Sequence, residues 1–243
     1  MPSHVLLPGL CIVPTPIGNL GDITRRAIET LQQADLIACE DTRRTLGLLN
    51  FLGISKPLWS YHAHSPRHRP RQLIDALQAG KRVALVCDAG TPGLSDPGTH
   101  LVKTAIEAGI PVVSLPGPCA AITALVGSGL PTDRFFFIGF LPRRTARAKR
   151  VLEKALASEA TVVVYESPYR TAETVRLIAE LAGPGTPLVI ARELSKVHEE
   201  FIRGRAQDIV AALEAQPPIG EVVILVNAGD VGADRCPVPD VTQ

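Results

Sequence analysis

Apolar runs and amphipathic segments alternate along the whole chain. The apolar runs are short and nearly continuous, which is typical of buried strands in a parallel sheet, and helical periodicity separates them. In the first half the pattern predicts strands near residues 10–13, 35–39, 57–60, 82–87 and 112–115, and helices near 24–34, 43–51, 69–79, 98–108 and 119–128. Such regular alternation favours an α/β fold built on a parallel sheet.

The pattern breaks at Gly-Leu-Pro131 and restarts with Phe135-Phe-Phe-Ile-Gly139. From there it predicts strands near 135–139, 161–166, 187–192 and 221–226, a short extra strand near 199–204, and helices near 146–157, 170–181 and 206–215. Because of this extra strand, we expect the second sheet to contain both parallel and antiparallel strands. We therefore predict an N-terminal α/β domain over residues 1–130 and a C-terminal α/β domain over 131–243, ending in a polar tail from Ala228 onward.

The composition is that of a globular protein, with 46% hydrophobic and 20% charged residues among 243. No apolar run has the length needed to cross a bilayer, and the first residues lack the basic start of a signal peptide. Five cysteines, at positions 11, 39, 87, 119 and 236, form no CxxC pair, which predicts reduced thiols and a cytoplasmic protein. A net charge of +1 gives no support for a nucleic-acid partner, so local clusters must carry that argument.

The segment VALVCDAGTPGLSDPG, residues 83–98, is the most informative one in the chain. An apolar run leads into Asp88, and three glycines, two prolines and a second acid follow. Similar loops follow the first strand (residues 12–22) and the fifth (114–121). Since ligands of open α/β sheets bind beyond the carboxyl ends of strands, three such loops favour a ligand site over elaborate turns. The loops contain neither G-x-G-x-x-G nor a Walker lysine, which weighs against NAD and ATP.

Several polar segments allow a structural and a functional interpretation. Glu40, Asp41 and two arginines follow the second strand, where acids serve equally well as a helix start or as cleft residues. His62 and His64 alternate as zinc ligands can, but no carboxylate or cysteine lies nearby at ligand spacing, so no metal is expected. With the basic residues of Arg67–Arg71, this segment is more typical of an RNA-facing loop. The cluster Arg143–Arg150 suits either a solvated helix or phosphate binding.

Taken together, these segments resemble the tetrapyrrole-methylase superfamily, and more closely its ribosomal-RNA branch. The matching segments run in family order: VPTPIGNLGDIT (13–24), CEDTRRT (39–45), CDAGTPGLSDPG (87–98), LPGPCAAITAL (115–125), DRFFFIGFLPR (133–143), YESPYR (165–170), ARELSKVHEE (191–200) and GEVVILV (220–226). The resemblance implies a parallel-sheet N-terminal domain and a mixed-sheet C-terminal domain with a cofactor cleft between them. It also implies S-adenosylmethionine as cofactor and a cytoplasmic homodimer.

By motif position, the resemblance places the cofactor against Pro16 of the first loop, and against Asp88, Ala89, Gly90, Thr91, Leu94, Cys119, Ala120, Tyr165, Glu166 and Leu194. The activity it implies is 2′-O-methylation of a cytidine ribose in 16S rRNA of the small ribosomal subunit, with no membrane or DNA partner. A ribose hydroxyl needs a nearby base or positive charge, so the candidates are Glu40 or Asp41 as base and Lys196 or Arg170 as charge stabiliser. The rival interpretations are a tetrapyrrole methylase of the same superfamily and a non-catalytic RNA-binding protein.

Overall fold

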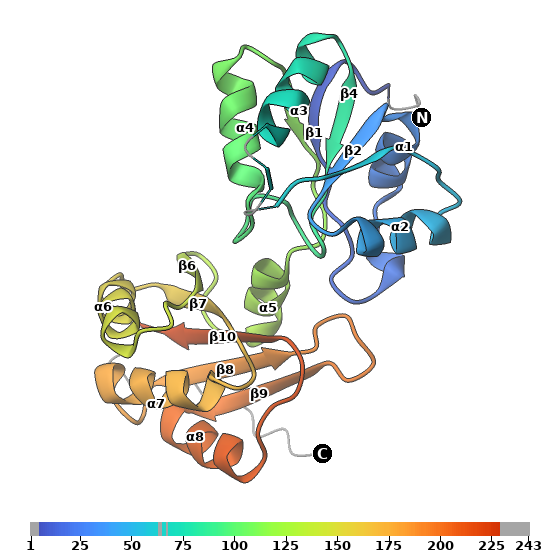
Figure 1. Ribbon diagram of the computed structural model, residues 1–243. Helices are drawn as coiled ribbons and strands as arrows, with labels where there is room; N and C mark the ends of the chain where they lie inside the picture. The colour runs from blue at the N-terminus through green and yellow to red at the C-terminus, as the bar shows by residue number, and fades with distance from the viewer. Residues whose placement is uncertain (1–4, 63–64, 67, 229–243) are drawn as a thin grey trace. The chain divides into compact units, whose positions relative to one another are not determined.

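The computed structural model describes residues 5–62, 65–66 and 68–228. The chain forms two compact units, residues 1–119 (unit 1) and 120–243 (unit 2). Figure 1 shows both units, each with a sheet and its helices. The predicted boundary after residue 130 would leave the helix at 120–128 with the first domain, whereas its contacts group it with the second unit.

Unit 1 contains a five-stranded parallel sheet in the order β3-β2-β4-β1-β5. Its elements are β1 (Gly9–Ile12), a 3-10 helix (Leu20–Asp22), α1 (Arg25–Gln33), β2 (Leu36–Cys39), α2 (Thr42–Phe51), β3 (Leu58–Ser60), α3 (Arg69–Gln78), β4 (Arg82–Leu85), α4 (Gly98–Glu107) and β5 (Val112–Ser114). The predicted parallel α/β architecture is confirmed, and the structure adds the 3-10 helix, which hydrophobic periodicity does not signal.

Two apolar layers cover the faces of the first sheet. Helices α1 and α2 pack on one face around Leu31 and Leu49. Helices α3 and α4 pack on the other face around Leu73 and Leu101. Thr24 is the N-cap of helix α1, and its hydroxyl accepts a hydrogen bond from Ala27 N. Because β2, β4 and β1 are covered on both faces, their side chains are apolar apart from Arg82 at the start of β4, as the continuous runs predict.

Unit 2 begins with α5 (Ala120–Ser128), and its five-stranded sheet has the order β6-β7-β10-β8-β9. The remaining elements are β6 (Phe135–Phe140), α6 (Thr145–Leu156), β7 (Thr161–Glu166), α7 (Thr171–Ala182), β8 (Pro187–Arg192), β9 (Glu200–Arg205), α8 (Ala206–Ala215) and β10 (Val222–Asn227). Strands β6 and β7 are parallel and all other neighbours are antiparallel, so the predicted mixed sheet and its extra strand are confirmed.

The second sheet has helices α6, α7 and α8 on one face and α5 on the other (Figure 1). Strand β9 holds the end of α5 in two ways. A Cβ on Gly127 would lie 2.6 Å from Cζ of Phe201, so only glycine fits beneath that ring. Arg203 donates to the carbonyls of Gly127 and Ser128, at 2.6 and 3.1 Å, which satisfies carbonyls at the helix end.

Among the described residues, no helix combines the length and hydropathy required of a membrane span. The polar tail was predicted from Ala228 onward, but Ala228 itself is buried in the apolar core of unit 2. Residues 229–243, Cys236 among them, lie outside the described part of the chain.

Candidate active site

The loops after β1, β4 and β5 are joined by hydrogen bonds at the carboxyl edge of the first sheet. Thr15 and Gly90 exchange both backbone hydrogen bonds, at 2.9 and 3.0 Å, and the Thr15 hydroxyl donates to Cys87 O at 3.1 Å. The Thr91 hydroxyl donates to Pro118 O at 2.8 Å. The three strand-end loops are therefore joined to one another, and the ligand site that they were predicted to form stays a prediction.

Two glycines show why this surface needs residues without side chains. Gly90 has φ +85°, in the left-handed region that favours glycine. A Cβ on Gly117 would lie 2.6 Å from Cβ of Pro14, so the first and third loops approach each other too closely for any larger residue. Thr15 and Pro14 were not among the predicted site residues, because a threonine and a proline within a turn carry no distinctive sequence signal.

The acids of the 87–98 loop hold the loop itself in place. Asp96 accepts from Gly93 N at 2.7 Å and from Gly98 N at 2.6 Å. Asp88 accepts from Asp41 N at 3.0 Å and pairs with Arg44 at 3.5 Å. The predicted cofactor residue Asp88 thus connects the β4 loop to the β2 loop through its carboxylate.

The groups that the 87–98 loop leaves exposed are small or apolar. Ala89 and Leu94 are exposed, the latter at 42%. The segment contains no lysine or arginine, so it offers shape and backbone groups rather than a clamp for phosphates. These properties fit a nucleoside-like ligand without phosphates, such as S-adenosylmethionine.

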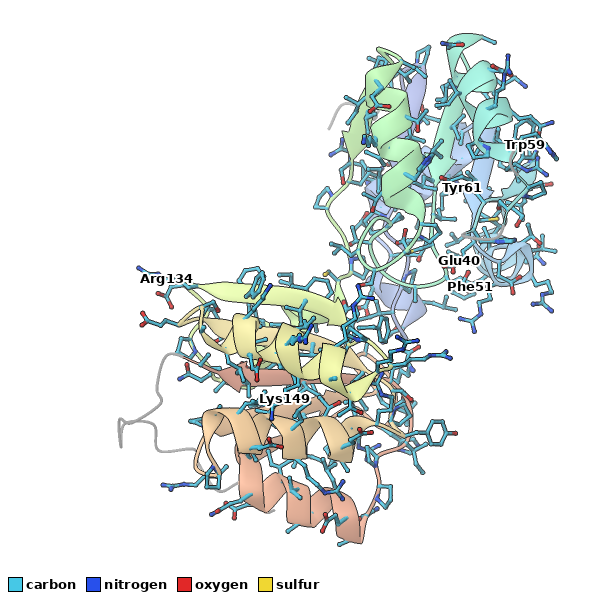
Figure 2. All side chains as sticks on the ribbon, turned by 60° about the vertical axis from the view of Figure 1, so that its left-hand side comes forward. Glu40, Phe51, Trp59, Tyr61, Arg134 and Lys149 are labelled. Atoms are coloured by element: carbon cyan, nitrogen blue, oxygen red, sulfur yellow. The ribbon has the colours of Figure 1, made fainter. Side chains whose placement is uncertain are left out.

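Glu40 and Asp41 have opposite environments. Asp41 is the N-cap of α2, where its carboxylate accepts from Arg43 N at 2.8 Å and pairs with the Arg43 guanidinium at 2.7 Å. These Arg43 bonds lower the pKa of Asp41 to about 2. Glu40 lies beyond the end of β2 (Figure 2), where burial first, and then the negative charges of Asp88 and Asp96, raise its pKa above the ordinary value of a glutamate. Of the pair, Glu40 has the higher proton affinity and therefore better suits a general base.

In unit 2, Tyr165 connects the end of β7 to the start of α5. Its hydroxyl accepts from Ala121 N at 3.0 Å, within the first turn of α5. The rings of Phe137 and Phe140 contact it edge-on, with centroids 4.8 and 5.5 Å away. The predicted residues Ala120 and Tyr165 thus come from segments that meet, whereas Cys119 closes unit 1 and is half-buried.

Glu166 points into the protein, with its side chain only 1% exposed. It accepts from Ser167 N at 2.8 Å and from the Thr174 hydroxyl at 2.9 Å, and Arg170 lies 3.6 Å away. Arg170 donates to the carbonyls of Leu141 and Pro142. These bonds give Glu166 and Arg170 a structural task in the turn after β7, which their sequence position alone did not reveal.

The end of β8 contributes Leu194, which is buried, and Lys196. Lys196 Nζ lies 2.7 Å from Glu193 Oε1 and 3.2 Å from Glu221 Oε2. Its charge is therefore bound by two carboxylates, which argues against the predicted role as a stabiliser of developing negative charge.

The two basic clusters differ. His64 and Arg67 lie outside the described residues, and Arg69 stacks over Trp59 at 5.4 Å from the ring centroid. In the second cluster Lys149 pairs with Glu180 of α7, while Arg143, Arg144, Arg147 and Arg150 are exposed and form no salt bridge with any described residue.

In the part of the chain that the structure describes, no group of three or more His, Cys, Asp or Glu side chains is arranged to hold a metal ion.

Comparison with known proteins identifies the family. The sequence profile of the tetrapyrrole (corrin/porphyrin) methylases matches residues 9–210. The ribosomal RNA small subunit methyltransferase I of Synechocystis sp. is 46% identical over 226 residues, 93% of this chain and 81% of that protein. Its namesake from Thermotoga maritima is 45% identical over 219 residues, 90% of this chain and 97% of that protein.

The fold is also that of solved methylases. The uroporphyrin-III C-methyltransferase of Thermus thermophilus, complexed with S-adenosyl homocysteine, superposes with a TM-score of 0.62 at 19% identity, over 92% of this chain and 100% of that one. At that identity the likeness shows the fold alone, while the closer sequence relatives show the branch. The chain therefore belongs to the tetrapyrrole (corrin/porphyrin) methylase family and, within it, to the ribosomal RNA small subunit methyltransferase I group.

Proposed function

We propose that this protein is an S-adenosylmethionine-dependent methyltransferase that methylates the 2′-hydroxyl of a cytidine ribose in 16S rRNA. The observation that carries the proposal is 46% identity, over 93% of the chain, with a protein named for methylation of small-subunit ribosomal RNA. The joined strand-end loops of unit 1, which contain no lysine or arginine, support it, because they suit a nucleoside-like cofactor without phosphates. A substrate within the ribosomal subunit also implies a cytoplasmic location.

For the cofactor contacts, we propose Pro16, Asp88, Ala89, Gly90, Thr91, Leu94 and Cys119 of unit 1, and Ala120, Tyr165 and Leu194 of unit 2. When bound, S-adenosylmethionine supplies a methyl group on positively charged sulfur. The backbone and apolar groups of the loops orient it and exclude water, which favours an in-line displacement. Glu166 contributes indirectly, since its carboxylate supports the turn that follows Tyr165.

For the proton, we propose Glu40 as the general base. The ribose 2′-hydroxyl loses its proton to a Glu40 carboxylate oxygen as the oxygen–carbon bond forms. The raised pKa of Glu40 gives the carboxylate the proton affinity this step needs. Glu40→Gln should lower single-turnover methylation by roughly 10²-fold or more. Asp41→Asn is the matched control, since asparagine caps helices as well as aspartate does and should leave the rate nearly unchanged.

The test of the activity is direct. Purified protein is incubated with S-adenosylmethionine and small ribosomal subunits from cells lacking it, and nuclease digests of the rRNA are analysed by mass spectrometry. The proposal expects one 2′-O-methylcytidine per subunit. A methylated base would contradict the ribose assignment. Methylation of a porphyrin precursor, with none of the rRNA, would instead place the protein with the tetrapyrrole-modifying members of the family.

A homodimer is also proposed, on the evidence of apolar side chains that unit 2 leaves exposed. Strand β6 is an edge strand with Phe135, Phe136 and Phe140 exposed at 44, 46 and 62%, and Val126 of α5 is exposed at 73%. Exposed apolar groups on an unpaired edge are typical of an interface. Light scattering after size exclusion should give the mass of a dimer, and Phe140→Ser should shift it toward a monomer.

The matched control for the dimer is Phe51→Ser, because Phe51 lies on α2 of unit 1 and is equally exposed, at 63%. It should leave the dimer intact. A monomeric wild-type protein at micromolar concentration would contradict the dimer and leave the enzymatic proposal standing.

A further inference from the structure

An ion-pair cluster closes the loop between β8 and β9, and it is here called the Lys196 clamp. It consists of Glu193, Lys196 and Glu221, with Gly220 beside them. Lys196 Nζ lies 2.7 Å from Glu193 Oε1 and 3.2 Å from Glu221 Oε2. Glu193 Oε1 also accepts from Glu221 N at 2.9 Å, and Glu193 N donates to Glu221 O at 3.0 Å. The clamp thus ties the loop to the start of β10.

The backbone held by the clamp is strained on both sides of Leu194. Glu193 has φ +51° and Ser195 has φ +63°, in the left-handed region that residues with a Cβ rarely adopt. Ser195 N donates to Glu199 Oε2 at 2.6 Å, which fixes the second of these residues. Such conformations persist where surrounding contacts impose them, and they concentrate at functional sites.

Gly220 shows that the fit of the clamp is tight. Its φ of +90° favours glycine, and a Cβ built on it would overlap the Glu193 carboxylate. The glycine therefore gives that carboxylate room to reach both Lys196 Nζ and Glu221 N. Any side chain at position 220 would displace Glu193 and open the clamp.

The register of the second sheet places the clamp beside the proposed cofactor residues of unit 2. Strands β7 and β8 are both antiparallel to β10, so their carboxyl ends lie at the same edge of the sheet. Val222 pairs with Glu166 on one side and with Arg192 on the other. Figure 1 shows the β8–β9 loop extending from this edge, where β10 begins. Leu194 follows β8 by two residues, so the clamp holds a segment at the edge where β7 delivers Tyr165.

The electrostatics of the clamp bind the charge of Lys196 firmly. Burial opposes protonation, but the Glu193 and Glu221 carboxylates outweigh it and raise the pKa of Lys196. The hydrogen bond from Lys196 in turn lowers the pKa of Glu193. Lys196 therefore stays charged and paired at neutral pH, and it is not available to a reacting oxygen.

We propose that Lys196 is a positioning residue for methyl-donor binding: with Glu193 and Glu221 it holds the strained turn that presents Leu194 to the cofactor. This inference rests on the proposed function, because it takes Leu194 to be a cofactor contact. It replaces the role of Lys196 as a charge stabiliser. The clamp should therefore set the affinity for the cofactor and leave the chemical step alone.

The experiment measures S-adenosylhomocysteine affinity by calorimetry, and KM and kcat for S-adenosylmethionine, in the full-length protein. Lys196→Met and Gly220→Ala should each raise the Kd and KM at least tenfold and leave kcat at saturating cofactor within threefold. Lys196→Arg, which keeps the charge, should recover part of the affinity and provides a second variant if Lys196→Met fails to fold.

Two controls match the perturbations. Gly183→Ala also adds a Cβ at positive φ, +99°, but no atom lies within 4 Å of it. Arg176→Met breaks another ion pair of unit 2, with Glu214 at 2.6 Å. Both should keep the wild-type Kd. Unchanged affinity in folded Lys196→Met and Gly220→Ala would overturn the proposal, as would a fall in kcat at constant Kd, which would return Lys196 to the chemical step. Failure of the wild-type protein to bind S-adenosylhomocysteine would instead count against the proposed function.

Discussion

Replacing Glu166 by glutamine tests whether this residue supports the fold or contacts the cofactor. The buried carboxylate accepts two hydrogen bonds, from Ser167 N and the Thr174 hydroxyl. Glutamine retains one acceptor oxygen, so one charge-assisted bond is lost, which costs about 1.5–3 kcal/mol. Arg170, partly exposed at 3.6 Å, adds up to about 1 kcal/mol. We expect Glu166→Gln to lower the free energy of unfolding by about 1.5–4 kcal/mol.

The assay is thermal unfolding beside calorimetric titration with S-adenosylhomocysteine. A loss of this size in a domain of about 120 residues lowers Tm by roughly 6–16 °C, while the Kd of the folded protein should change less than about threefold. Glu173→Gln, an exposed change on helix α7 beside Thr174, should stay within about 0.5 kcal/mol of wild type. An unchanged Tm with a tenfold weaker Kd for Glu166→Gln would refute the structural role and return Glu166 to the cofactor contacts.

Three further predictions concern the site and its substrate. Because Glu40 becomes protonated at low pH and cannot then act as a base, single-turnover methylation should fall as the pH drops through its raised pKa. In Glu40→Gln this inflection of the pH profile should be absent, and Tm at neutral pH should not be lowered. The double charge reversal Arg144→Glu, Arg147→Glu should reduce the slope of log K for RNA binding against log salt concentration by about 1.4–1.8 and leave cofactor affinity unchanged. An unaltered slope would show that these arginines are solvated and do not bind RNA phosphates. Gly90→Val should weaken S-adenosylhomocysteine binding at least tenfold, whereas Gly109→Val, also at positive φ but in open space, should not; equal affinities would remove Gly90 from the site.

Most of the fold follows from the alternation of apolar runs and amphipathic segments, because buried strands and two-sided helix layers impose that alternation. The predicted mixed second sheet is present, since the run at 199–204 pairs with β8 as strand β9. The unit boundary is harder to predict. Helix α5 follows a first-domain strand directly, and only its packing on β7, β8, β9 and β10 groups it with unit 2.

The glycine- and proline-bearing loops after the strands were recognisable from the sequence, and the structure joins two of them through Thr15 and Gly90, while their contact with the cofactor stays a prediction. Structural roles that depend on a particular hydrogen-bond or ion-pair partner elsewhere in the chain were not predictable. Glu166 and Lys196 follow strands just as a cleft residue would, yet Thr174 and Glu221 bind them. A single sequence does not reveal such pairings, because charged side chains at strand ends occur in structural and functional sites alike.

The most direct test of the central claim is mass mapping of ribose methylation on 16S rRNA from cells that lack this protein. The account predicts that one 2′-O-methylcytidine disappears, and that it returns when the wild-type chain is restored but not when Glu40→Gln is supplied at the same abundance. A complete set of ribose methylations in the cells without the protein would contradict the proposed activity.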